Sequence, residues 1–330
     1  MAVLSEFQRL CRLAGSRLDW IQAGGGNASI KRGDTRMTIK ASGAALAMVS
    51  DTHGVVDVNY PQIVRFLRDA DRPRDWVLPQ LSEGRPSIET YMHAALGAVV
   101  LHIHPWVALP LLCSPNWQAN ITEIMGPGHV YVPYSTPGVD LGIAVANSTR
   151  SLSGTVVIWL QSHGLIVSGP TESEVLQCTD DVTATVATAL GIDCAPDRRV
   201  TQLQLKIEAT TGDLPVVYRC KTPLFLEQDL VARASNVGPL FPDQAVFCGP
   251  EWPLASDLAS YCARYGTYPP LIRHGSDVYV AAKSIQRARE IEDVATAQLT
   301  AVKWGVSLDP LSSEEIRFLQ NWDAEKWRMQ

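Results

Sequence analysis

The residues of this sequence best suited to chemistry are three histidines and one glutamate. His102 and His104 stand two apart in the apolar run Leu101–Pro105. Because side chains alternate along a strand, these two imidazoles point to the same side, about 7 Å apart along the chain. His163 follows a second apolar run, and Glu89 lies upstream. Three neutral nitrogen ligands and one carboxylate suit a divalent ion such as Zn²⁺ that keeps a position open for substrate.

Two roles are open for Glu89. As a metal ligand it would neutralise charge, and beside the metal it could carry a proton, helped by burial that raises its pKa. His93 follows one helical turn later and could orient that carboxylate or act as a spare ligand. We expect Ser87 to cap a helix that carries Glu89 and runs to Gly97.

Apolar spacing predicts the elements that must position these side chains. Helices are expected over 3–16, 142–150 and 171–190, and strands over 27–31, 37–40, 99–104, 129–132 and 155–160. The pair Gly33-Asp34 favours a hairpin between the first two strands. Short connections between alternating helices and strands predict an α/β fold, in which a mixed sheet carries helices on both faces.

Three polar patches at the ends of these elements favour an anionic or polyhydroxylated substrate. The glycine loop before Asn27 lacks the dinucleotide and P-loop signatures, but it can present backbone N–H groups to an anion. The turn from Lys40 to Ser42 and Gly43 repeats this pattern, and Ser87 belongs to a third patch.

Composition excludes several classes of protein. The chain has 330 residues, of which 46% are hydrophobic and 19% charged, with a net charge of −6. This length predicts about two domains, and the charge favours neither nucleic acid nor a membrane surface as partner. No apolar run reaches the roughly 18 residues of a membrane span. The cysteines are scattered without a Cys-x-x-Cys pair, so we expect reduced thiols and a cytoplasmic location.

Six motifs also occur in an order typical of one known family. They are Gly25–Ser29 (GGNAS), Lys40–Gly43 (KASG), Ser87–His93 (SIExxxH), Leu101–Pro105 (LHIHP), Val132–Gly138 (VPYxxPG) and Ser162–Leu165 (SHGL). On these motifs, residues 5–190 resemble the class II aldolase/adducin family, which includes the zinc-dependent fuculose- and rhamnulose-phosphate aldolases. The resemblance implies a three-layer α/β/α sandwich with a mixed, largely antiparallel central sheet. It also implies a homotetramer with active sites between subunits.

The resemblance assigns a role to each candidate residue. His102, His104 and His163 would be zinc ligands, with Mn²⁺ or Co²⁺ as other candidate ions, and Glu89 the acid/base carboxylate that can also touch the metal. The substrate phosphate or hydroxyls would be bound by Asn27, Ser42, Gly43 and Ser87. Two departures concern the phosphate. Ile88 stands where fuculose-type enzymes have a second serine, and Lys40 replaces an uncharged residue and could bind a carboxylate or phosphate.

The expected function is therefore a metal-dependent lyase that acts on a ketose or ketose phosphate. It would cleave a carbon–carbon bond by retro-aldol chemistry through a metal-stabilised enediolate. Decarboxylation of a 3-keto sugar acid or its phosphate would use the same apparatus. Two alternatives remain, a pentulose-phosphate 4-epimerase and an adducin-like scaffold without metal. The complete set of ligands argues against the scaffold.

The C-terminal part shows no chemistry of its own. We expect a metal-binding catalytic domain over 1–210 and an α+β segment over 211–330 that serves packing or assembly. Strands are predicted at 245–247 and 277–281, and capped helices at 285–304 and 314–328. The last helix carries Phe318, Trp322 and Trp327, so its aromatic face should be packed on the first domain or on another subunit.

Overall fold

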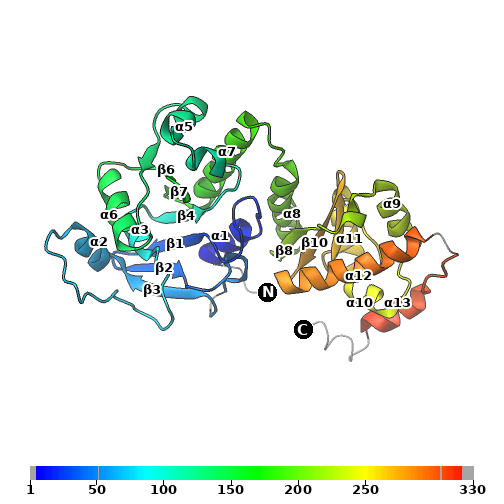
Figure 1. The fold of residues 1–330 in the computed structure, drawn as a ribbon. Coiled ribbons are helices and arrows are strands. Elements are labelled where there is room, and N and C mark those ends of the chain that lie inside the picture. Colours follow the sequence, from blue (N-terminus) through cyan, green and yellow to red (C-terminus); the bar gives the residue numbers. More distant parts are fainter. Residues whose placement is uncertain (1–4, 51, 305–306, 322–330) are drawn as a thin grey trace. The chain divides into compact units, whose positions relative to one another are not determined.

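The computed structural model describes residues 5–50, 52–304 and 307–321 (Figure 1). The chain divides into two compact units, Ala2–Ala195 and Pro196–Gln330. This division precedes the boundary expected at residue 210. The reason is that helix α8 (Ala195–Thr211) packs Val200, Leu203 and Ile207 into a core of the second unit.

The first unit contains a sheet with the strand order β3-β2-β1-β4-β7-β6-β5. In chain order these strands are β1 (Asn27–Arg32), β2 (Arg36–Lys40), β3 (Val55–Asn59), β4 (Val99–Ile103), β5 (Val130–Val132), β6 (Val156–Leu160) and β7 (Gly164–Gly169). Only β5 and β6 pair in parallel, and the other neighbours are antiparallel. The sheet is therefore mixed and largely antiparallel, as predicted. The strands over 55–59 and 164–169 are additions to the predicted set.

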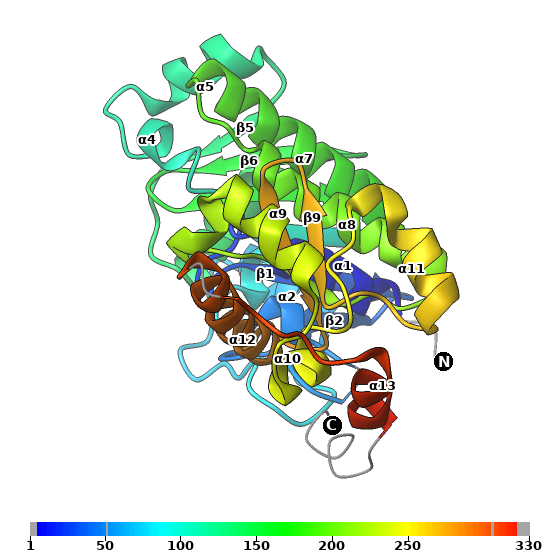
Figure 2. The ribbon, with the colours of Figure 1, turned by 90° about the vertical axis from the view of Figure 1, so that its right-hand side faces the viewer.

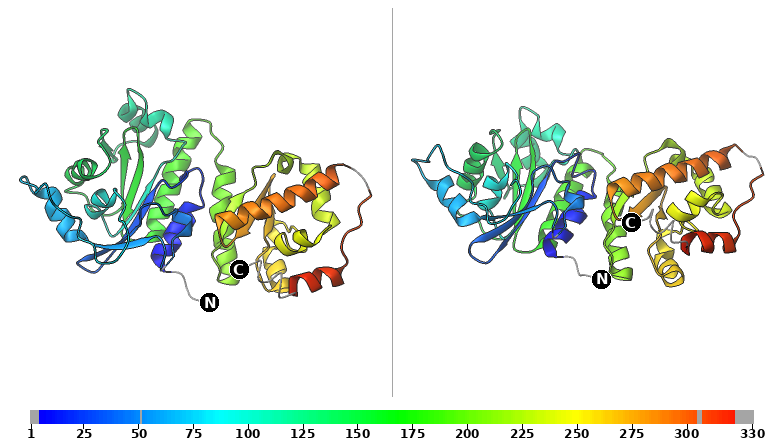
Figure 3. Two further views of the ribbon diagram at one scale, coloured as in Figure 1. Left: turned by 60° about the horizontal axis from the view of Figure 1, so that its bottom comes forward. Right: turned by 90° about the horizontal axis from the view of Figure 1, so that it is seen from below.

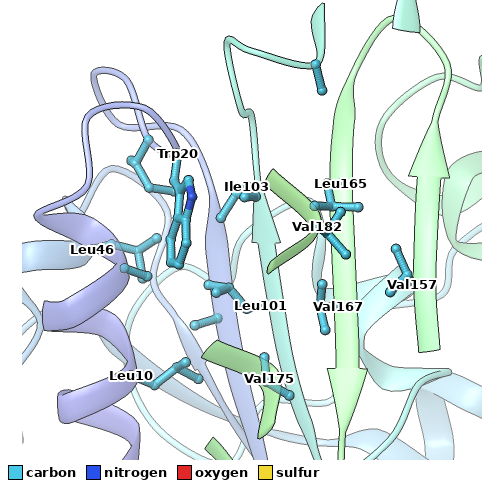
Figure 4. Close-up of a cluster of buried hydrophobic side chains, with 14 of the residues drawn as sticks. Leu10, Trp20, Leu46, Leu101, Ile103, Val157, Leu165, Val167, Val175 and Val182 are labelled. Atoms are coloured by element: carbon cyan, nitrogen blue, oxygen red, sulfur yellow. The ribbon is translucent and has the colours of Figure 1, made fainter. Parts of the chain in front are cut away.

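Helices cover both faces of this sheet and make the predicted three-layer α/β/α sandwich (Figure 1). One face packs against α1 (Glu6–Gly15), α4 (Leu109–Leu112), α5 (Trp117–Met125) and α7 (Glu172–Ala189). The other face packs against α2 (Tyr60–Arg68), α3 (Thr90–Ala94) and α6 (Val139–Ser148). Figure 4 shows Leu101 and Ile103 of β4 in the first of these cores, beside Trp20 and Leu165.

Local signals account for the ends of several elements. Ser5 caps α1 in a capping box with Gln8, and the side chain of Thr171 accepts the Glu174 N–H at the start of α7. Gly33 has a φ of +61° in the turn that joins β1 to β2, which is the predicted hairpin.

Two predicted elements are wrong. The helix at Glu89 is only α3, with Glu89 itself as N-cap, because the Ser87 hydroxyl accepts the Glu89 N–H within a preceding turn. The segment 245–247 is the end of helix α10 (Pro242–Phe247) and no strand, since a short apolar run alone does not distinguish the two.

The second unit is built on a three-stranded antiparallel sheet with the order β8-β10-β9. Its strands are β8 (Val216–Arg219), β9 (Leu271–His274) and β10 (Asp277–Ala282), and its further helices are α9 (Gln228–Val237), α11 (Leu258–Tyr265), α12 (Ile285–Lys303) and α13 (Ser313–Asn321). Helices α9 and α12 pack on one face of the sheet, and α8 and α11 on the other (Figure 2). Figure 3 shows α12 along its full length. The expected α+β segment is confirmed.

The predicted covering of the last helix concerns residues that lie only partly within the described ranges. Phe318 of α13 is 64% exposed, while Trp322 and Trp327 lie outside the described residues. Among the residues that the structure describes, no helix has both the length and the apolar character needed to cross a bilayer.

Candidate metal centre

His102 and His104 project together from the end of β4. His102 pairs with Asn27 of β1 on one side and with Ile166 of β7 on the other, so it lies in the middle of the sheet. The Nε2 atoms of His102 and His104 are 3.0 Å apart, and their rings are inclined at 72°. The same-side orientation predicted for the pair is what the structure shows.

His163 reaches the pair from the turn between β6 and β7. Ser162, just before His163, has a φ of +52°, which is unusual for a residue other than glycine. The Ser162 N–H donates to the Leu112 carbonyl at 3.1 Å, which helps to hold this unusual conformation. The ring of His163 lies 4.9 Å from that of His102 and 5.1 Å from that of His104, measured between centroids.

Glu89 completes the group from the turn before α3. Its Oε1 atom lies 3.2 Å from Nε2 of His102 and 3.5 Å from Nε2 of His163. The four ligand atoms of Glu89, His102, His104 and His163 all lie within 4.8 Å of one another. The structure thus brings together side chains from three separate segments of the sequence.

The geometry of this quartet fits a divalent ion. Bonds of about 2.0–2.1 Å around a tetrahedral ion place ligand atoms roughly 3.4 Å apart. The separations of 3.0, 3.2 and 3.5 Å between these ligand atoms are close to that value. Nitrogen with one carboxylate is also the donor set that zinc and similar transition metals favour.

The pKa shifts of Glu89 and His104 also fit a cation. Burial alone would raise the pKa of Glu89, but His102 and His163 lower it, and the net effect holds the pKa well below its usual range. Burial lowers the pKa of His104 to about 3, assisted by His102 and His163. At neutral pH the site therefore offers an ionised carboxylate and a neutral imidazole, as metal binding requires.

Backbone groups orient the histidines. Nδ1 of His102 lies 3.0 Å from the Leu165 carbonyl, which leaves Nε2 for the metal. The His104 N–H donates to the Trp20 carbonyl at 3.0 Å, so the loop before β1 holds this residue. His93 is fully buried and stands apart from the quartet, with Nδ1 2.8 Å from the Ser29 hydroxyl.

Two glycines allow the close packing of the histidines, and sequence analysis assigned them no such role. A Cβ on Gly164 would lie 2.3 Å from the Ile103 carbonyl oxygen and 3.0 Å from Cδ2 of His104. A Cβ on Gly25 would lie 2.9 Å from Nδ1 of His104. The run of glycines before β1 was a signal for the second of these contacts, although we had connected that run with an anion.

Residues 5–190 match the sequence model of the family described as Class II Aldolase and Adducin N-terminal domain. The chain belongs to the class II aldolase/adducin family. The match ends close to the end of the first unit, so membership concerns the unit that contains the metal-ligand quartet.

Individual relatives of this class II aldolase/adducin chain are distant. It is 30% identical over 172 residues to an uncharacterised oxidoreductase, YuxG, of Bacillus subtilis (strain 168), a match that covers 47% of this chain and 25% of the relative. The chain thus spans about a quarter of that protein's length. An N-terminal class II aldolase domain from Thermoplasma acidophilum is similar at 24% identity with a TM-score of 0.49, over 57% of this chain and 94% of the other. An l-fuculose-1-phosphate aldolase from Thermus thermophilus is 17% identical with a TM-score of 0.40, over 57% and 93%.

Asn27 is the candidate substrate residue that contacts the quartet directly. Its Nδ2 lies 3.4 Å from Oε2 of Glu89, and its Oδ1 is buried without a hydrogen-bond partner among the described residues. A buried amide oxygen without a hydrogen-bond partner destabilises the folded protein, so a donor that reached this atom would bind favourably. A substrate hydroxyl would supply one.

The other candidate substrate residues lie in two segments, at the end of β2 and before α3. Lys40 is 3% exposed, and its ammonium donates to the Ala44 carbonyl at 2.8 Å. Burial lowers the pKa of Lys40, while the negative charge of Glu89 opposes this shift. Ser42 and Gly43 are exposed, and the Ser42 N–H donates to the carbonyl of Arg85 in the segment that leads to Ser87. The polar patches at the end of β2 and before α3 are therefore neighbours.

Proposed function

We propose that the first unit is a metal-dependent lyase that cleaves a carbon–carbon bond of a ketose or ketose phosphate by retro-aldol chemistry. The observation that carries the proposal is the complete quartet of His102, His104, His163 and Glu89, whose ligand atoms all lie within 4.8 Å of one another. Zn²⁺ is the ion that we favour, with Mn²⁺ and Co²⁺ as candidates for the same nitrogen-rich site.

In this proposal the three histidines and Oε1 of Glu89 would hold the ion, and Oε2 of Glu89 would transfer a proton. When bound, the ion would supply Lewis-acid stabilisation of negative charge on a substrate oxygen. The two oxygens of Glu89 face different partners, because Oε1 lies against the histidines and Oε2 against Nδ2 of Asn27. We assign proton transfer at the substrate carbon to Oε2, the oxygen that lies away from the three imidazoles.

Asn27 and the buried surroundings would prepare Glu89 for this role. The Asn27 amide orients Oε2, while its unpartnered Oδ1 can accept a hydrogen bond from a substrate hydroxyl. His102 is fully buried, and the side chains of Glu89 and His163 are 12% and 15% exposed, so substrate binding would exclude much of the remaining water. Charges interact more strongly in such a site than in open solvent.

The polar patches would bind the rest of the substrate. Ser42, Gly43 and Ser87 belong to neighbouring segments and can offer hydroxyl and N–H donors to a phosphate or sugar hydroxyls. Ile88 is 60% exposed where a second serine would add a donor, which favours a substrate that needs fewer phosphate contacts. Lys40 would add positive charge close to Glu89.

A substrate screen tests the proposal. The full-length protein, loaded in turn with Zn²⁺, Mn²⁺ and Co²⁺, would be incubated with ketose phosphates, free ketoses and 3-keto sugar acids. We expect an aldehyde and a three-carbon ketone product from one ketose, formed about 10²-fold or more slowly by the Glu89→Gln variant. Release of CO₂ from a 3-keto acid without aldehyde formation would show that the protein is a decarboxylase and not an aldolase. Inactivity with every class would contradict the proposal.

We further propose that the protein assembles as a homotetramer, on the resemblance described above. Light scattering coupled to size-exclusion chromatography would measure the mass directly. A mass equal to that of one 36.0 kDa chain would refute this part of the proposal and leave the metal chemistry untouched.

A further inference from the structure

The second unit contains a cavity that the proposed lyase chemistry does not use. Its volume is about 470 Å³, which falls in the range of roughly 300–1,000 Å³ found for small-molecule sites. Its walls come from the end of α10, from α11, from the end of β10 and from the first turns of α12. All of these elements belong to one compact unit, so the cavity needs no contribution from the metal centre.

One side of the cavity is cationic. Lys283 immediately precedes Ser284, the N-cap of α12, and Arg287 lies in the first turn of that helix. The guanidinium of Arg287 is 4.8 Å from the ring centroid of Phe247 and pairs with Glu290 at 2.9 Å. None of the described residues that line the cavity is acidic. The positive end of a long helix adds to the attraction for an anion.

The opposite side is aromatic and contains an accessible hydroxyl. Tyr261, Tyr265 and Tyr268 line the cavity, and the rings of the first two lie 4.5 Å apart. Tyr261 is only 3% exposed as a whole residue, but its hydroxyl is not one of the fully buried polar atoms that lack a partner, so this hydroxyl is accessible from the cavity. Burial raises the pKa of Tyr261, so this hydroxyl stays protonated and can donate.

We propose that this cavity binds a small organic anion that joins a phosphate or carboxylate group to a flat apolar body. The anionic group would lie between Lys283 and Arg287 at the start of α12. The flat body would pack against the tyrosine rings, and one of its polar atoms would accept a hydrogen bond from Tyr261. Such a site gives the second unit a ligand of its own.

Calorimetric titration of the full-length protein tests the two halves of the proposed ligand separately. AMP carries both a flat base and a phosphate, adenosine carries the same body without the charge, and inorganic phosphate carries the charge alone. Salicylate offers a carboxylate on a flat ring. We expect AMP or salicylate to bind more tightly than both adenosine and phosphate.

Variants place the binding in the cavity. Lys283→Gln removes a charge and should weaken binding by about three- to tenfold, the range expected for a partly exposed charged contact. Tyr261→Phe keeps the ring and should weaken binding by about two- to tenfold, as for the loss of one neutral hydrogen bond. Arg289→Gln removes an exposed charge from the same helix outside the cavity, and should leave the affinity unchanged.

Three results would overturn the inference. The first is that neither AMP nor salicylate binds at millimolar concentration. The second is that adenosine binds as tightly as AMP and salicylate does not bind, since the cationic side would then contribute nothing. The third is that Arg289→Gln weakens binding as much as Lys283→Gln does.

Discussion

The substitution Gly164→Ala tests whether the metal centre depends on close packing between β4 and β7. The new Cβ would lie 2.3 Å from the Ile103 carbonyl oxygen, 3.0 Å from Cδ2 of His104 and 3.3 Å from Cε1 of His102. The first contact is with backbone, which can move only if β4 and β7 separate where Ile103 pairs with Leu165. Such overpacking costs about 1–3 kcal/mol of unfolding free energy.

This loss of unfolding free energy can be measured as a fall in Tm. For a domain of this size, that loss corresponds to a fall in Tm of roughly 2–12 °C. Because His102 and His104 are displaced together, metal affinity should fall by about 10–100-fold, as when groups that orient ligands are lost. Differential scanning calorimetry of the metal-free protein and titration with Zn²⁺ would measure the two effects separately.

Gly24→Ala is the matched control. A Cβ at Gly24 meets nothing within 4 Å, so this variant should keep the Tm and metal affinity of the parent. If Gly164→Ala matched the control in both measurements, the packing described around the histidines would be incorrect.

Three further outcomes follow. The Glu89→Gln variant should keep its metal, but its turnover should fall by about 10²-fold or more. Loss of metal would show that Glu89 is mainly a ligand, and a normal rate would show that its role is structural. Burial lowers the pKa of Lys31 to about 8 in the folded protein, below the 10.5 of an unfolded lysine. Between pH 8 and 10.5 the unfolded state therefore binds more protons than the folded state. The free energy of unfolding should accordingly rise with pH across this range. Urea unfolding of the parent and of Lys31→Met should show their stability difference shifting in favour of the parent from pH 8 to 10.5, and a constant difference would refute this. Truncation near residue 222 should give insoluble or wrongly assembled protein in which the candidate metal ligands are still present. The reason is that truncation removes β9 and β10 from the core around Leu203. A soluble fragment of native oligomeric size and full activity would contradict this.

The shared orientation of His102 and His104 could be predicted because strand geometry acts locally. The spacing of His102 and His104 places both rings on one side wherever the strand lies in the sheet. Residue type suggested His163 and Glu89 as partners of this pair, and the family motifs gave each of them a role, since strand spacing alone cannot link distant segments. The structure agrees with that connection, since all four ligand atoms meet.

The surroundings of the ligands could not be predicted, because they depend on which strands become neighbours. The Leu165 carbonyl orients His102 only because β7 pairs with β4. The space kept by Gly164 and Gly25 depends likewise on how β7 and the loop before β1 meet His104. No local pattern in the sequence encodes these pairings.

The sequence also predicted short helices poorly. Ser87 looked like an N-cap, yet its hydroxyl closes a turn one step earlier and the helix starts at Thr90. In the second unit, three apolar residues at 245–247 carried no periodicity to separate a strand from the end of α10. Both errors arose where only a few residues were available to decide.

The metal content of the purified protein tests the central claim most directly. Elemental analysis of the parent should give one divalent transition-metal ion per chain, held by His102, His104 and His163 with Glu89. His104→Ala removes one nitrogen ligand and should bind metal far more weakly, while His53→Ala, which removes a histidine outside the quartet, should keep the full content. Unchanged metal in His104→Ala, or no metal in the parent after loading with Zn²⁺, would contradict the account.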